Sequence, residues 1–230
     1  DTLISVSNLA SLYTDKGDCE QAEALYKRCL EAREQLRGAE HPETMDTCYK
    51  LAECLSKIEH QEEAIFLRRK ELAWCRKEKG NHDWSTLESM NSLAIDLREY
   101  GEYKEAESLF REVIAIRQET LSTEDFENGQ ALGGLYKTLE KAGQLKEALI
   151  YAQKCFDHRS LYEGKDGFYT NRNRLDLARI LNKLDRKGEA LVLLNDVQKS
   201  FNKIDDLNED HKSLLLKVFE LQDFINQSGI

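Results

Sequence analysis

Apolar and polar residues follow a helical rhythm along this chain, and the rhythm repeats at a fixed interval of 42 residues. Leucine returns at this interval as Leu9, Leu51, Leu93, Leu135 and Leu177. Alanine returns in the same way as Ala22, Ala64, Ala106, Ala148 and Ala190. Apolar neighbours of these positions recur three or four residues apart, which is the spacing of one face of an α-helix. The pattern therefore predicts a series of similar helical hairpins.

Each repeat is interpreted as two helices joined by a short turn. The predicted helix pairs span residues 2–16 and 19–37, 43–57 and 61–79, 84–99 and 103–121, 126–141 and 145–162, and 168–184 and 187–203. Gly17, Gly101 and Gly143 occupy the same turn position, where a left-handed backbone favours glycine. Glu59 and Asp185 stand at that position in the second and fifth repeats, so we expect less favourable turns there. The recurrent alanine predicts a close crossing of the two helices, which leaves no room for a larger side chain.

These elements predict an all-α chain that is stacked in series. A helical hairpin cannot bury its apolar face alone, whereas stacked hairpins bury one another. We therefore divide residues 1–211 into five repeats, at 2–43, 44–85, 86–127, 128–169 and 170–211. A last helix, over about 210–226, is rich in leucine and phenylalanine, and we assign 212–230 as a capping helix for the open end. Because the helical pattern is already under way at Asp1 and Thr2, we expect the natural protein to continue upstream.

Composition restricts the function classes. The net charge of −10 argues against general nucleic-acid binding, which needs basic surface for phosphate contacts. It argues equally against docking on anionic membranes. No apolar run approaches the roughly 20 residues that span a bilayer, and the start shows no signal-peptide pattern. The six cysteines form no C-x-x-C pair, which indicates reduced structural thiols and a cytoplasmic protein without a metal site or cofactor.

No catalytic motif stands out in the chain. The phosphate-binding glycine loops, the H-E-x-x-H zinc motif and the G-x-S-x-G nucleophile turn are all missing from the sequence. The five histidines are scattered, and 43 acidic residues on helical surfaces bring carboxylates together by chance. We therefore expect a non-catalytic protein.

The residues of the first repeat resemble the tetratricopeptide repeat. Leu9, Ala10 and Tyr13, the turn at Gly17, and the stretch from Asp18 to Tyr26 carry the likeness best, and the third repeat matches through residues 92–94 and 101–110. The standard unit has about 34 residues. The longer period and the junction over residues 40–44 look like the kinesin-light-chain subtype, which also occurs in bacterial sensor and signalling proteins. The resemblance implies a right-handed α-solenoid of about five helix–turn–helix repeats plus a C-terminal capping helix.

The resemblance also implies that the first helix of every repeat lines a concave groove. The candidate ligand-binding residues are Asn8, Tyr49, Lys50, Asn91, Arg98, Gly133, Gly134, Lys137, Lys141, Arg172, Arg179 and Lys183. Formal charge at the groove positions runs −1, 0, −1, +1 and +2 from the first repeat to the fifth. The basic residues of repeats four and five therefore suggest an acidic segment in the partner. The adjacent glycines Gly133 and Gly134 suggest either room for a bulky ligand group or a place where the array bends.

The aromatic residues at the repeat junctions, Trp84, Phe126 and Phe168, are interpreted as wedges between successive units. The leading hypothesis for function is a scaffold that binds a protein or peptide in its groove, as part of a larger protein. One alternative is a ligand-sensing regulatory module that controls an attached enzyme or ATPase. Another is a self-association module that uses the open N-terminal face and the last helix. The sequence leaves the oligomeric state open.

Overall fold

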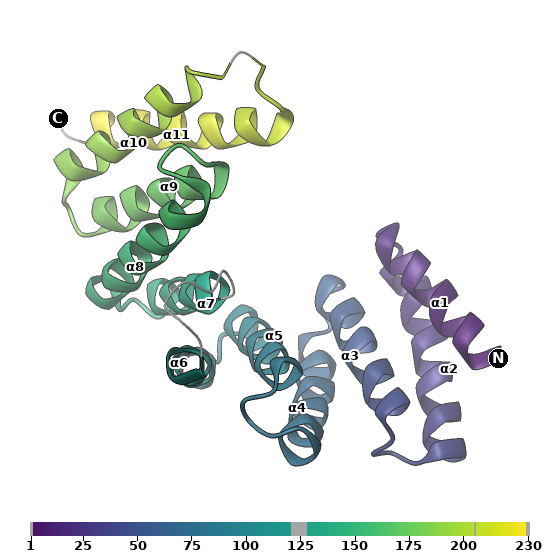
Figure 1. Ribbon diagram of the computed structural model, residues 1–230. Helices are drawn as coiled ribbons and strands as arrows, with labels where there is room; N and C mark the ends of the chain where they lie inside the picture. The colour runs from purple at the N-terminus through teal and green to yellow at the C-terminus, as the bar shows by residue number, and fades with distance from the viewer. Residues whose placement is uncertain (1, 121–127, 205, 229–230) are drawn as a thin grey trace. The chain divides into compact units, whose positions relative to one another are not determined.

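The computed structural model describes residues 2–120, 128–204 and 206–228 of the chain (Figure 1). All regular secondary structure within these residues is α-helical, so the predicted all-α class is confirmed. The helices are α1 (Thr2–Asp15), α2 (Cys19–Arg37), α3 (Pro42–Lys57), α4 (Gln61–Glu78), α5 (Trp84–Tyr100), α6 (Tyr103–Thr120), α7 (Asn128–Lys141), α8 (Leu145–Glu163), α9 (Phe168–Lys183), α10 (Lys187–Phe201) and α11 (Glu209–Gln227). The predicted helices agree with these bounds to within about two residues. Residue 121 and residues 126–127 of the predicted helices lie outside the described residues. The predicted wedge residue Phe126 is one of them.

The helices form two compact units, an N-terminal unit of residues 1–116 and a C-terminal unit of residues 117–230. In the N-terminal unit, each helix from α1 to α4 packs against the next one along the chain. The same serial packing runs from α7 to α11 in the C-terminal unit. This arrangement confirms the predicted α-solenoid class, whereas the predicted repeat limits stay predictions.

Helix starts and turns follow local chemistry that the sequence shows directly. The carboxylate of Asp83 accepts the Ser85 backbone N–H at 2.9 Å and so caps the start of α5. Gly101 ends α5 with a φ of +104°, in the left-handed region where glycine has no steric penalty. Glu59 and Asp185 take the same left-handed conformation, with φ of +63° and +60°. The two turns without glycine therefore have the same left-handed backbone conformation as the others. This conformation is strained in a residue with a Cβ atom.

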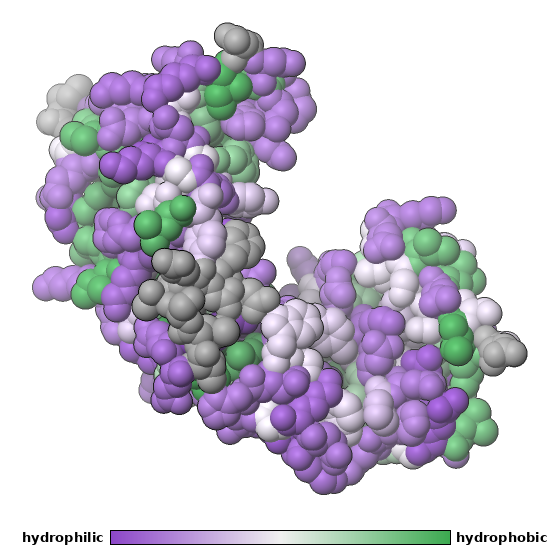
Figure 2. Space-filling model, in the orientation of Figure 1, coloured by the Kyte–Doolittle hydropathy of each residue, from purple (hydrophilic) through white to green (hydrophobic). Residues whose placement is uncertain are grey.

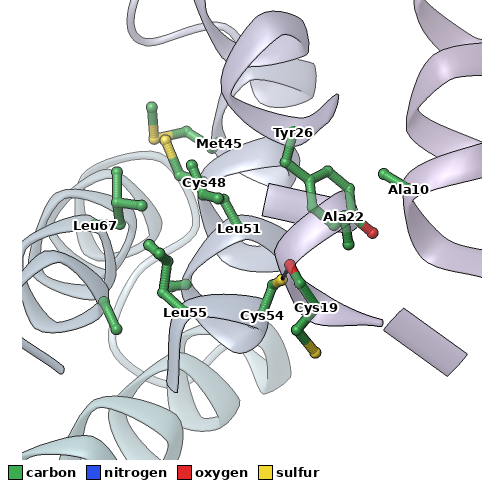
Figure 3. Close-up of a cluster of buried hydrophobic side chains, with 12 residues drawn as sticks. Ala10, Cys19, Ala22, Tyr26, Met45, Cys48, Leu51, Cys54, Leu55 and Leu67 are labelled. Carbon is green, nitrogen blue, oxygen red and sulfur yellow. Dashed lines mark hydrogen bonds between the residues drawn. The ribbon is translucent and has the colours of Figure 1, made fainter. Parts of the chain in front are cut away.

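The recurrent alanines and leucines form the core. All five alanines are fully buried, as the close crossing of the helices in each hairpin requires. The repeated leucine is buried in the later repeats, but Leu9 on α1 is 44% exposed. In Figure 3, Ala22 and Tyr26 of α2 lie between Ala10 of α1 and the side chains of α3. Each hairpin thus contributes to the core of the next, and α1 has no hairpin before it in the described residues.

Ion pairs between successive second helices repeat with the same interval as the core. Lys27 pairs with Glu63 at 3.0 Å, and 42 residues further on Arg69 pairs with Glu105 at 2.6 Å. These side chains are largely exposed, so each pair contributes at most about 1 kcal/mol. The pairs place opposite charges on the facing surfaces of neighbouring hairpins.

The end of the C-terminal unit is covered by α11, as the predicted capping helix requires. Leu214, Val218 and Ile225 are buried where α11 packs against α9 and α10. The opposite end of the chain differs, since apolar surface remains on α1, where Ile4, Leu9 and Leu12 are exposed (Figure 2). None of the helices described here combines the length and the apolar character needed to cross a membrane.

Candidate functional site

A cavity of about 480 Å³ opens in the N-terminal unit, where α3 and α5 meet the C-terminal end of α4. We call it the tryptophan pocket, because it contains both tryptophans of the chain. Its lining residues are Pro42, Met45, Asp46 and Tyr49 of α3, Glu71 and Trp74 of α4, Lys79 after α4, and Trp84, Ser85 and Glu88 of α5. The pocket thus joins the first helices of two successive repeats, and it combines aromatic rings with carboxylates.

Helix capping places these residues at the rim. Trp84 is the first residue of α5, directly after the capping residue Asp83, and Pro42 is the first residue of α3. Pro42 suits this position, because the first helical residue needs no backbone N–H. Trp84 is 60% exposed, so its ring is not enclosed between the repeats, and its interpretation as a wedge stays a prediction. A ring at a helix start lies at the edge of the packed core, where it remains accessible.

One carboxylate of the pocket is buried without a counter-ion. Glu71 is only 7% exposed, and its two oxygens accept hydrogen bonds from Ser89 Oγ and, at 3.0 Å, from Cys75 Sγ. No basic group within the described residues forms an ion pair with Glu71. Burial and the bond to Glu71 raise the pKa of Cys75 to about 12, so this thiol stays protonated and donates. Glu71 therefore accepts two hydrogen bonds at the wall of the pocket and has no counter-ion among the described residues.

The other charged residues of the pocket are Asp46, Glu88 and Lys79. Asp46 pairs with Lys50 at 2.9 Å, whereas Glu88 is half-buried and has no ion pair in the described part of the chain. Lys79 Nζ lies 5.3 Å from the centre of the Trp74 ring and 2.7 Å from Ser85 Oγ. An ammonium group of the protein itself is thus already held against one aromatic wall.

The predicted site residue Tyr49 is positioned by a buried ion pair. The guanidinium carbon of Arg68 lies 4.5 Å from the centre of the Tyr49 ring. Arg68 Nε also donates to Asp96 Oδ2 at 3.1 Å, and Ser56 Oγ donates to Asp96 Oδ1 at 2.9 Å. The side chains of Arg68 and Asp96 are only 5% and 8% exposed. Three successive helices, α3, α4 and α5, therefore meet at one buried electrostatic contact behind the pocket.

The remaining predicted residues of the N-terminal unit are dispersed. Asn8 is exposed on α1, and Arg98 pairs with its neighbour Glu99 at 2.8 Å. Asn91 is buried in α5, 3% exposed, and its side-chain amide makes no hydrogen bond with the described residues. None of these three lines the tryptophan pocket. Of the predicted residues, Tyr49 is therefore the one that the pocket contains, with Lys50 paired to its wall.

In the C-terminal unit, two of the predicted basic residues on α9 partly neutralise acids of α7 and of α9 itself. Arg179 forms ion pairs with Glu140 and Asp176 at 2.9 Å, and Lys183 pairs with Glu140 at the same distance. Burial raises the pKa of Glu140, but hydrogen bonds from Arg179 and Lys183 outweigh burial and hold it below its usual range. Charge counting at the groove positions missed these pairs, because it treated every side chain as independent.

The other basic candidates of this unit lie on α7 and α9. Lys137 Nζ is 5.8 Å from the centre of the Tyr136 ring, and Lys141 is exposed. Arg172 is exposed on α9 and has no ion pair in the described residues. Arg172 is thus an exposed basic candidate on the predicted first-helix face.

The adjacent glycines of α7 lie beside a large buried side chain. Tyr136 replaces the small residue of the other repeats, and its hydroxyl donates to Asp176 at 2.6 Å. A Cβ on Gly133 would lie 3.9 Å from both Cys155 Sγ and the Tyr136 ring, which is ordinary van der Waals contact. Gly134 is buried, and its carbonyl accepts Thr138 Oγ1 at 2.8 Å. Steric space therefore does not require glycine at Gly133.

A second cavity, of about 630 Å³, lies between α8, α9 and α10. It is lined largely by aliphatic side chains, including Ile150 and Val192, which are more than half exposed. Because α8 and α10 are second helices of their repeats, this cavity belongs to the face opposite to the predicted groove positions. It provides an internal comparison for any binding experiment.

One cluster in the N-terminal unit brings together groups of the kind that bind metals, namely Glu23, His60 and Glu63. Lys27 Nζ lies 2.8 Å from Glu23 and 3.0 Å from Glu63, so an ammonium group already bridges the two carboxylates. The cluster is therefore explained as part of the ion pairs between second helices.

Serial helical hairpins with a pocket between first helices define a helical-repeat protein, and the comparisons name the family. Family models described as tetratricopeptide repeat match residues 1–71 and 86–127. Both matched segments are tetratricopeptide repeats, and the fold of the chain is similar to that of kinesin-light-chain-like repeat proteins. No curated protein sequence matched the chain.

Solved structures show the same fold at low sequence identity. A putative kinesin light chain of Podosopora anserina with nearly identical TPR-like repeats is 23% identical, with 90% of this chain and 98% of that chain covered and a TM-score of 0.79. BtubC (BKLC) from P. vanneervenii is 16% identical, with coverages of 88% and 81% and a TM-score of 0.74. The Rap conjugation gene regulator of the plasmid pLS20, solved in complex with the Phr* peptide, is 14% identical, with coverages of 98% and 75% and a TM-score of 0.62.

Proposed function

We propose that this chain is a non-catalytic module that binds a protein or peptide through the first helices of its repeats. The observation that carries the proposal is the tryptophan pocket, in which the predicted site residue Tyr49 and Asp46 of α3 lie with Glu88 of α5, on the first helices of two successive repeats. Pockets lined by aromatic rings with a few polar groups are the usual form of a recognition site. A structural neighbour solved with a bound peptide supports the choice of a peptide as ligand.

The test is selection of binding peptides from a random display library on the whole chain, followed by hydrogen exchange of the complex. We expect bound peptides to protect α3, α5 and the C-terminal end of α4, which line the pocket, with no change in α2. The aliphatic cavity between α8 and α10 provides the contrast. Peptides that protect only α8 and α10, or a library that yields no binder, would show that the proposal is wrong.

A narrower proposal concerns an acidic segment of the partner, which would lie against the fourth and fifth repeats. Arg172 supports it, because this side chain is exposed on α9 and forms no ion pair with the described residues. An exposed pair adds only about 0–1 kcal/mol, so apolar contacts must supply most of the affinity. Labelled acidic peptides should bind less tightly to Arg172→Glu than to the wild type, and equal affinity would refute this narrower proposal.

The sensor and self-association alternatives stay predictions, as does the cytoplasmic location. A sensor would need an attached enzyme or ATPase. The full-length sequence of the natural protein would show whether such a domain is present. Light scattering across a range of concentrations tests self-association, since a monomer at all concentrations would exclude it.

A further inference from the structure

The tryptophan pocket has a charge and ring arrangement that selects one kind of side chain. Glu71 is a buried carboxylate without a counter-ion in the described residues, and Glu88 at the rim also has no ion pair there. Tyr49, Trp74 and Trp84 supply aromatic surface beside these two acids. A cation is attracted to the face of such rings, and most strongly to tryptophan.

The protein itself shows how a cation lies in this pocket. Lys79 holds its ammonium group 5.3 Å from the centre of the Trp74 ring, with Ser85 Oγ as its hydrogen-bond partner at 2.7 Å. Behind the pocket, the Arg68 guanidinium stacks on the Tyr49 ring at 4.5 Å. Both contacts use aromatic faces to hold positive charge, but neither places a cation on Glu71 or Glu88.

We propose that the tryptophan pocket binds an arginine side chain of the partner peptide, with the guanidinium stacked on the aromatic rings and hydrogen-bonded to Glu71 and Glu88. Arginine suits this arrangement better than lysine, because its planar guanidinium stacks on rings and offers several donors to carboxylates at once. The cavity of about 480 Å³ has room for such a side chain beside Lys79. This inference rests on the proposed peptide-binding function and adds the chemistry of the ligand.

Both tryptophans of the chain line the pocket, so intrinsic fluorescence reports its occupancy directly. The probes are blocked pentapeptides that differ only in a central arginine, lysine, leucine or glutamate between glycines and serines. We expect a saturable change of tryptophan emission with the arginine peptide, a weaker response with lysine, and no saturation with glutamate. A leucine peptide that binds as tightly as the arginine peptide, or an arginine peptide that gives no saturable change, would overturn the proposal.

Substitutions separate charge recognition from folding. Glu71→Gln and Glu88→Gln should each weaken binding of the arginine peptide about tenfold, whereas the exposed control Glu102→Gln should leave it unchanged. Lys79→Met should tighten binding several-fold, because it removes a competing cation while it keeps the apolar stem. Glu88→Gln keeps the test valid if Glu71→Gln fails to fold. The proposal would be contradicted if Glu88→Gln bound the arginine peptide as tightly as the wild type and Lys79→Met bound it more weakly.

The outcome is distinct from that of the library selection. Peptides that protect α3 and α5 without any enrichment of basic residues would refute arginine recognition and leave the peptide-binding function in place. A selection that yields no peptide on the first helices would instead remove the function itself.

Discussion

The buried ion pair behind the pocket permits a sharp prediction about stability. Asp96 accepts hydrogen bonds from Arg68 Nε at 3.1 Å and from Ser56 Oγ at 2.9 Å, in a place where the two charged side chains are 5% and 8% exposed. Asp96→Ala would leave the guanidinium buried without its counter-ion. Removal of one partner of a buried pair typically destabilises by about 3–5 kcal/mol.

Replacement of both partners should behave differently. Arg68→Met combined with Asp96→Leu removes the two charges together and fills much of the same volume with apolar groups. Such double replacements of buried pairs are often neutral or even stabilising. We therefore expect the double variant to be more stable than Asp96→Ala by about 3 kcal/mol. The exposed control Asp15→Ala on α1 should change stability by less than about 0.5 kcal/mol.

The assay is urea unfolding followed by tryptophan fluorescence, because Trp74 and Trp84 both lie in the N-terminal unit and report on that unit alone. With a slope of about 2 kcal/mol per molar urea, Asp96→Ala should lower the midpoint by about 2 M. A loss below about 1 kcal/mol would show that the pair is not buried as described. A double variant as unstable as Asp96→Ala would show that the damage comes from lost packing rather than from the unpaired charge.

Three further predictions concern turns, helix α7 and acid stability. Glu59→Gly should raise stability by about 1 kcal/mol in urea unfolding, because it relieves a left-handed non-glycine residue, while Gly101→Ala, which has no steric neighbour within 4 Å, should lower it by a similar amount. Gly133→Ala should stabilise α7 by about 0.5–1 kcal/mol, seen as slower hydrogen exchange, and faster exchange would argue that this glycine is needed. Because its folded pKa is lowered, ionised Glu140 stabilises the C-terminal unit above its unfolded pKa near 4.5, and this contribution disappears as the pH falls through the folded pKa. Hydrogen exchange of α9 should accelerate over that acid range in the wild type and much less in Glu140→Gln.

The sequence was sufficient for elements whose cause is local or periodic. The turn at Gly101 follows from the lack of a side chain, and the start of α5 follows from the Asp83 cap. The buried position of Ala106 follows from recurrence every 42 residues, since a position that every repeat fills with a small residue must lie at a crossing. Tyr49 was predicted as a site residue from what the family resemblance implies for first helices; it lines the tryptophan pocket, and its role in binding stays a prediction.

The tertiary structure decided what lies beside what. Glu71 and Trp74 belong to a second helix and were not expected at the site, yet the end of α4 brings them to the pocket between α3 and α5. Arg179 was expected to offer its charge to a ligand, but the packing of α9 against its neighbours supplies Glu140 as a partner. The period of the sequence fixes which face of a helix a residue occupies. The charge and accessibility of that residue depend on side chains some forty positions away, and only their packing brings them together.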